Sequence, residues 1–90
     1  MTRSAPAYDT FRRALAGQRL PDAFVDLDAL AANLADLRAR AGGLPIRLVT
    51  KSIRSVAILR RVLATGPQFR GLMCYSPAEA AWLAAQGFDD

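Results

Sequence analysis

The stretch Pro45–Ser55, PIRLVTKSIRS, says most about how this chain folds. Its first half is an apolar, β-branched run of the kind found in strands that are covered on both faces. The run ends on Lys51, the only lysine in the sequence. Because strand side chains alternate between the two faces, the lysine is expected to share an inward face with Arg47 and Val49. The pattern predicts a buried strand that carries a lysine at its C-terminal end.

Helices and strands also alternate before this strand. A short amphipathic helix is predicted from Tyr8 to Gly17, and a short strand is predicted around Ala23–Asp26. Asp28 is a suitable N-cap for the next helix, whose leucines recur at helical spacing until two glycines at 42–43 end it. The N-terminal half is therefore expected to place one strand and one long helix ahead of Pro45.

The alternation continues after the lysine. A helix follows it, and Phe69–Tyr75, FRGLMCY, is predicted to be the next strand. Ser76 as N-cap, Pro77 at the first helical position and Glu79 as the glutamate of a capping box then predict a helix that runs to Gln86. Strands and helices that alternate through short loops pair in parallel with right-handed crossovers. The predicted fold class is α/β.

Three such strands do not complete a sheet. A doubly wound sheet and the start of a (β/α)8 TIM barrel are the two continuations, and no G-x-G-x-x-G sequence follows any strand. The barrel, which needs about 250 residues, is therefore favoured, and the 90 residues are expected to be its incomplete N-terminal portion. An apolar share of 52% agrees with this, because it implies surfaces that further chain would cover.

Composition excludes several other classes of function. The chain has a single cysteine and no histidine, so no disulfide can form within it and the usual Cys/His zinc site is excluded. Its net charge of +4 comes from arginines scattered along predicted helices and turns, without a nucleic-acid-binding motif. No apolar run approaches the roughly 18 residues of a membrane span. We expect a cytoplasmic protein that binds neither nucleic acid nor membrane.

Three stretches, in order, resemble one enzyme family. They are AFVDLDALAANLADLRARA (23–41), IRLVTKS (46–52) and GLMCYSPAEAAWLAAQGF (71–88). They are similar to the opening of the alanine-racemase-type barrel of fold-type III pyridoxal-phosphate (PLP) enzymes, with its V-D-L-D-A-L-x-x-N start, lysine-bearing first strand and E-A-x-x-L-x-x-x-G helix. The resemblance implies that residues 20–90 are the first βα units of this PLP-binding barrel, truncated, and that residues 1–19 are an N-terminal helical extension.

Within this superfamily the chain most resembles the D-threonine aldolase and amino-acid deaminase/aldolase branch. The lysine motif of that branch is similar to R-P-H-x-K-T-H-K, and Arg47 and Lys51 match it. Val49 and Ile53 replace its two histidines, and Arg54 stands at its second basic position. The lost histidines leave open whether the reaction is of the aldolase, deaminase or dehydratase type.

The resemblance also implies roles for individual residues. Lys51 would be the catalytic residue and would bind the cofactor, pyridoxal 5'-phosphate, through a Schiff base. Arg47 would contact the cofactor ring or keep the surroundings of the lysine polar, with a salt-bridged arginine at the barrel floor as the alternative. Arg54 would approach the cofactor phosphate or a substrate carboxylate, with a solvated helix start as the alternative. No metal ligand is expected in this chain, although the complete parent enzyme could use a divalent metal. The parent is expected to be a homodimer that acts on an amino acid, and the 90 residues alone are expected to be inactive.

Other interpretations stay open at this point. From spacing alone, a lysine at a strand end that reaches solvent is the simpler interpretation of Lys51. An alanine-racemase-like amino-acid racemase is one alternative, although the sequence after Lys51 lacks the tyrosine and glycines typical of racemases. A non-catalytic PLP-binding or cofactor-homeostasis protein is another, although the F-G-E-N sequence of such proteins is absent.

Overall fold

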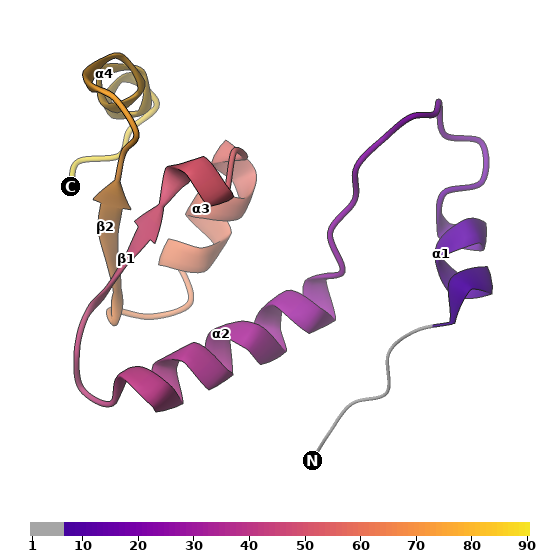
Figure 1. Ribbon diagram of the computed structural model, residues 1–90, viewed down its shortest axis with the longest axis horizontal. Coiled ribbons are helices and arrows are strands. Elements are labelled where there is room, and N and C mark those ends of the chain that lie inside the picture. Colours follow the sequence, from indigo (N-terminus) through magenta and orange to yellow (C-terminus); the bar gives the residue numbers. More distant parts are fainter. Residues whose placement is uncertain (1–6) are drawn as a thin grey trace.

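Two short parallel strands form the centre of this protein, and helices alternate with them along the chain (Figure 1). The computed structural model describes residues 7–90. Its elements are α1 (Tyr8–Ala14), α2 (Leu27–Ala41), β1 (Ile46–Val49), the 3-10 turn η1 (Thr50–Ser52), α3 (Val56–Leu63), β2 (Phe69–Met73) and α4 (Pro77–Ala85). The predicted α/β class and the parallel pairing are confirmed for this part of the chain, as a small open sheet.

The core lies on the helix-covered face of the sheet. It is a single cluster of buried residues from β1, β2, α2, α3 and α4: Leu34, Leu48, Leu59, Val62, Phe69, Leu72 and Leu83. The most deeply buried of them, Leu59 and Val62, come from α3, which links the two strands. Residues three apart on a helix lie on the same face, so one side of α3 packs on the sheet while its arginines stay outside.

The other face of the sheet is open. Val49 is paired with Met73 across the strands, and Met73 is 61% exposed. The sheet is therefore covered by helices on one side only within the described part of the chain.

No helix among residues 7–90 is long and apolar enough to cross a membrane.

A β-bulge interrupts the strand pair. Between the pairs Ile46–Phe69 and Leu48–Leu72, Arg47 of β1 lies opposite two residues of β2, one of which is Gly71. Gly71 has a φ of 78°, which favours glycine, and a Cβ placed there would collide with the Arg47 guanidinium. The bulge therefore lets the Arg47 side chain lie across β2.

The chain returns to β2 after α4. The N–H of Leu72 donates to the carbonyl oxygen of Asp90 at 3.1 Å, on the side of β2 away from β1. Phe88 packs against the core, and the Arg60 guanidinium lies 5.7 Å from the centre of its ring. The backbone of Asp90 therefore lies beside β2, at the edge that β1 leaves open.

Gln68 fixes the start of the sheet. Its side-chain amide nitrogen donates to the carbonyl oxygens of Gly42 and Leu44, each at 2.9 Å. Its backbone carbonyl oxygen accepts the N–H of Ile46 at 2.7 Å. The bond to Gly42 satisfies a carbonyl group at the C-cap of α2, and the bond to Leu44 holds the loop that follows the helix. Gln68 therefore connects the end of α2 to the first residue of β1.

Several boundaries differ from the prediction. Ala23–Asp26 is not a strand, because no neighbouring backbone in the described chain pairs with it. The N-cap of α2 is Asp26, not Asp28, since the Asp26 carboxylate accepts the N–H groups of Asp28 at 3.0 Å and Ala29 at 3.2 Å. The predicted helix at Tyr8–Gly17 is shorter, and ends at Ala14.

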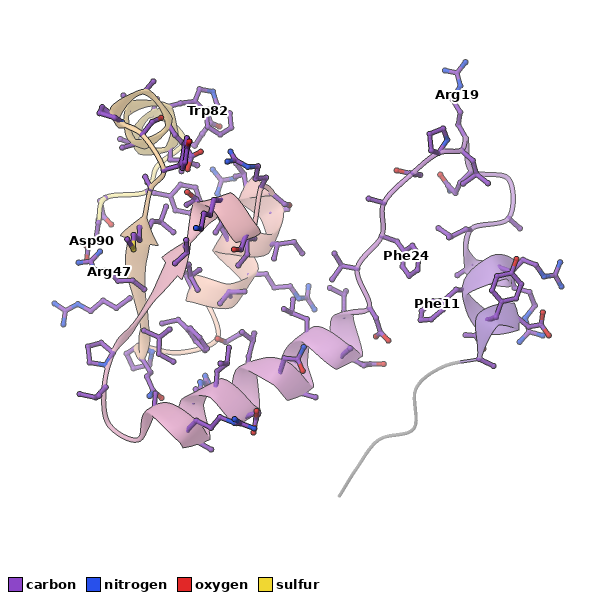
Figure 2. All side chains as sticks on the ribbon, in the orientation of Figure 1. Phe11, Arg19, Phe24, Arg47, Trp82 and Asp90 are labelled. Atoms are coloured by element: carbon purple, nitrogen blue, oxygen red, sulfur yellow. The ribbon has the colours of Figure 1, made fainter. Side chains whose placement is uncertain are left out.

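The N-terminal region stands apart from the body formed by α2–α4 (Figure 1). Phe11 of α1 packs against Phe24 of the following extended segment, with ring centres 5.0 Å apart (Figure 2). The radius of gyration is 15.5 Å, against about 12 Å expected for a compact chain of this length. Residues 1–6 of the predicted extension (1–19) lie outside the described residues.

Candidate functional site

The carboxyl ends of β1 and β2 lie at the same edge of the sheet, because the strands are parallel. At this edge lie η1, the residues that follow β2, and the first turn of α4 (Figure 1). In parallel α/β proteins, catalytic and binding groups are found at this edge. The candidate site is therefore defined by Thr50–Arg54, which follow β1, and by Tyr75–Glu79, which follow β2.

Lys51 is the second residue of η1 and follows β1 by one residue. Its side chain is exposed, and no hydrogen bond or ion pair holds it within the part of the chain that is described. The strand ends at Val49, so the alternation expected to run through Lys51 stops two residues earlier. The structure places the lysine at the predicted edge, on a turn and open to solvent.

The other two predicted cofactor contacts lie in different places. Arg54 reaches the edge, where its guanidinium donates to Glu79 at 2.9 Å and lies 6.0 Å from the centre of the Tyr75 ring. Arg47 lies on the sheet, where it donates to the Leu72 carbonyl at 3.2 Å and to the Asp90 carboxylate at 2.8 Å. The structure thus brings Arg54 to the edge that carries Lys51, and it holds Arg47 at the bulge.

Glu79 is the most connected side chain of the site. Its carboxylate accepts hydrogen bonds from the Thr50 hydroxyl, the Arg54 guanidinium and the N–H of Tyr75. The Glu79 side chain is only 17% exposed. The hydrogen bond from Thr50, helped by Tyr75 and Arg54, holds the pKa of Glu79 below its ordinary value of 4.5 against the opposing effect of partial burial. Glu79 is therefore ionised at neutral pH.

The predicted helix start explains how Glu79 is placed. Ser76 is the N-cap of α4, and its hydroxyl accepts the N–H of Glu79 at 3.1 Å, as predicted. The returning half of the capping box differs, because the Glu79 carboxylate accepts the N–H of Tyr75 at 3.3 Å. The same oxygen, Oε1, also accepts the Thr50 hydroxyl, and Oε2 accepts the Arg54 guanidinium across the edge.

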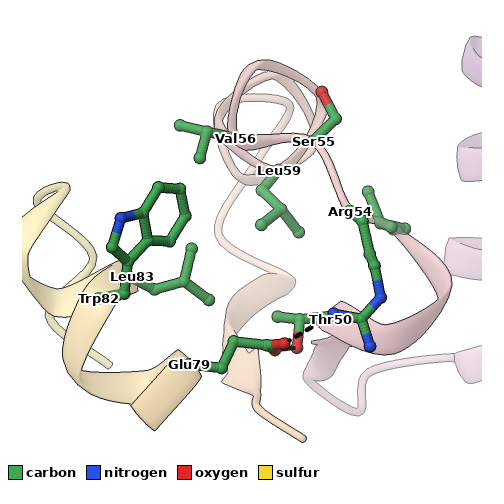
Figure 3. A pocket seen from close by; sticks show the side chains of 9 residues that line it. Thr50, Arg54, Ser55, Val56, Leu59, Glu79, Trp82 and Leu83 are labelled. Carbon is green, nitrogen blue, oxygen red and sulfur yellow. Dashed lines mark hydrogen bonds and ion pairs between the residues drawn. The ribbon is translucent and has the colours of Figure 1, made fainter.

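A pocket of about 230 Å³ opens beside this network, between α3 and α4 (Figure 3). It is lined by Thr50, Ile53, Arg54, Ser55, Val56, Leu59, Glu79, Trp82 and Leu83. Glu79 and Arg54 form its polar side, and Trp82, which is 55% exposed, forms part of its apolar side. Lys51 is not among its lining residues, so the pocket and the lysine are neighbouring features of one edge.

Sequence reasoning missed Thr50 and Trp82 and gave Glu79 only a capping role. Thr50 is 2% exposed, and its hydroxyl meets a carboxylate that is 29 residues away in the chain. No local pattern links two such positions. The available signal was a small polar residue at the end of a buried strand, directly before the lysine.

The side chains at this edge differ in how well they suit a metal ion and PLP. Residues 7–90 contain no group of three or more His, Cys, Asp or Glu that could hold a metal ion. The exposed primary amine of Lys51 fits an aldehyde cofactor, because it can be reached from solvent at a strand end. Arg47 and Arg54 are each paired with a carboxylate, so of the three predicted contacts the lysine fits best.

Comparisons with known proteins add no assignment. No protein-family model, curated protein or solved structure matches this chain. The candidate site therefore depends on its own geometry and on the motifs that the sequence carries.

Proposed function

We propose that this chain supplies the cofactor-bearing lysine of a PLP-dependent enzyme that acts on amino acids. The observation that carries the proposal is the location of Lys51: the only lysine of the chain lies exposed, directly beyond the C-terminal end of a parallel strand. The ordered resemblance of three stretches to the alanine-racemase-type barrel supports the same role. An aldolase, deaminase or dehydratase of the D-threonine aldolase type is the reaction class we favour.

The arrangement of the sheet supports the barrel part of this proposal. In a (β/α)8 barrel, helices cover the outer side of the strands and side chains of further strands fill the inner side. Here the helices cover one side of the sheet, and the side with Val49 and Met73 is open. The carbonyl oxygen of Asp90 accepts the N–H of Leu72 on the side of β2 away from β1, so that edge is available to a further strand. We propose that β1 and β2 are neighbouring strands of such a barrel.

Each residue of the edge would then have a distinct task. When bound, PLP supplies an electron sink that weakens a bond at the α-carbon of an amino acid. The Lys51 amine would hold the cofactor aldehyde and, once released, would take or give a proton at that carbon. Arg54, stacked near Tyr75 and paired with Glu79, would keep positive charge beside the lysine.

Reductive trapping tests the proposal directly. The complete protein, as the cell makes it, is isolated without added cofactor, treated with borohydride and digested with trypsin. A cofactor fixed on Lys51 blocks cleavage there, so we expect residues 48–54, LVTKSIR, as one peptide that carries a phosphopyridoxyl group. Lys51→Arg is the matched control, because it keeps the charge and removes the amine. Unmodified LVTK in full yield, with no phosphopyridoxyl group on any peptide, would contradict the proposal.

A further inference from the structure

One carboxylate holds both ends of the turn that carries Lys51. Glu79 accepts the hydroxyl of Thr50, the residue directly before the lysine, and the guanidinium of Arg54, three residues after it. Glu79 belongs to α4, so this anchor comes from an element that follows the other strand. Figure 3 shows the carboxylate reaching from α4 toward Thr50, with Arg54 beside it.

The turn has little support of its own. It contains three residues in 3-10 conformation, and the N–H of Ile53 donates to the carbonyl of Thr50 at 3.1 Å. Hydrogen bonds in 3-10 turns have poorer geometry than those of α-helices, and such turns stay short. Thr50 is buried, whereas Lys51 and Ser52 are exposed. The direction in which the lysine leaves the sheet therefore depends on anchors outside the turn.

We propose that Glu79 is a positioning residue for Lys51: its carboxylate fixes the Thr50–Arg54 turn and thereby fixes where the lysine amine is presented. The proposal rests on the proposed function only for the identity of the group that meets the amine. Helix capping does not account for this arrangement, because Ser76 already caps α4 through the N–H of Glu79. The bonds to Thr50 and Arg54 add nothing to the helix and bind only the turn.

Isotope labelling of lysine tests the proposal by NMR, because Lys51 is the only lysine of the 90 residues and its signal is identified by its loss in Lys51→Arg. We expect Glu79→Ala to shift the side-chain signal of Lys51 and to speed amide exchange at Ile53 about tenfold, as for loss of a hydrogen bond to a charged group. Asp36→Ala is the matched control, since Asp36 pairs with Arg40 on the far helix α2. It should leave the Lys51 signal in place and change exchange at Ile53 by less than about twofold.

Two further variants separate positioning from general stability. Thr50→Val removes the same anchor from the other end and should move the Lys51 signal in the same way. Glu79→Gln keeps an acceptor for the Thr50 hydroxyl and should restore part of the wild-type signal and exchange. A loss confined to helix stability would lower the melting temperature of Glu79→Ala without moving the Lys51 signal. If Glu79→Ala does not fold, Thr50→Val and Glu79→Gln carry the same comparison.

The outcomes distinguish this inference from the proposed function. A shifted Lys51 signal in Glu79→Ala and Thr50→Val supports positioning even if trapping finds no phosphopyridoxyl group on Lys51, which would contradict only the proposed function. Trapped cofactor on Lys51, together with a signal and an exchange rate that change no more than in Asp36→Ala, would overturn the positioning role while the proposed function stands.

Discussion

Replacing Gly71 by alanine should destabilise the strand pair more than the same change at an open glycine. Gly71 has a φ of 78°, and its missing Cβ leaves the space that the Arg47 guanidinium occupies. An alanine in a left-handed conformation costs about 1–2 kcal/mol. Moving Arg47 aside would also loosen its bonds to Leu72 and Asp90, an exposed set that contributes about 1 kcal/mol or less. We expect a total loss of about 1–3 kcal/mol of unfolding free energy, up to about 1 kcal/mol more than the backbone conformation alone would cost.

Two other glycines provide matched controls. Gly87, after α4, also has a positive φ, 105°, but has open space at its Cβ, so Gly87→Ala should cost about 1–2 kcal/mol from the backbone alone. Gly43 has open space and no positive φ, so Gly43→Ala should be neutral or slightly stabilising. Urea unfolding of the three variants gives the comparison. The reasoning fails if Gly71→Ala costs no more than Gly87→Ala, or if Arg47→Ala does not reduce the difference between them.

Three further predictions concern the core and the edge. Leu59→Ala should cost about 2–5 kcal/mol of unfolding free energy, because Leu59 is 2% exposed, whereas the exposed Leu37→Ala should cost far less; equal losses would contradict the assigned core. Ser76→Ala should cost about 1 kcal/mol and leave the yield of trapped cofactor per folded molecule unchanged; a lower yield at normal stability would show that the hydroxyl has a chemical role. The pKa of Glu79 is lower in the folded chain than in the unfolded one, so its stabilising contribution is present above about pH 4.5 and is lost as pH falls through the folded pKa. Between pH 7 and pH 3 the melting temperature should therefore fall less steeply for Glu79→Gln than for the wild type. Equal slopes of melting temperature against pH in the two proteins would refute this.

The elements set by local chemistry could be predicted from the sequence. The strand at Ile46–Val49 follows from its β-branched residues, and the start of α4 follows from Ser76, Pro77 and Glu79, which the structure confirms at the N-cap, first and third positions. Each of these signals acts over three or four residues. Short-range hydrogen bonds and side-chain alternation are sufficient to define them.

Features that depend on a distant partner could not be predicted. Ala23–Asp26 has the composition of a strand, but a strand forms only where another backbone pairs with it, and the sequence does not show whether one is near. Asp26 and Asp28 are equally good N-caps by residue type. In the structure Asp26 is the N-cap, and α2 begins at Leu27. Thr50, the first residue after β1, likewise has its hydroxyl bound to a carboxylate from α4 that is 29 residues away in the chain.

The candidate site combines both kinds of information. The start of α4 is local and predictable, and it sets Glu79 three residues after the cap. The direction of the Glu79 carboxylate depends on tertiary structure, because the parallel strands bring α4 beside the turn after β1. Glu79, part of the capping motif at the start of α4, therefore also holds the turn that follows β1. The sequence identifies Lys51 as the candidate residue, but only the folded structure shows that Glu79 binds the turn that carries it.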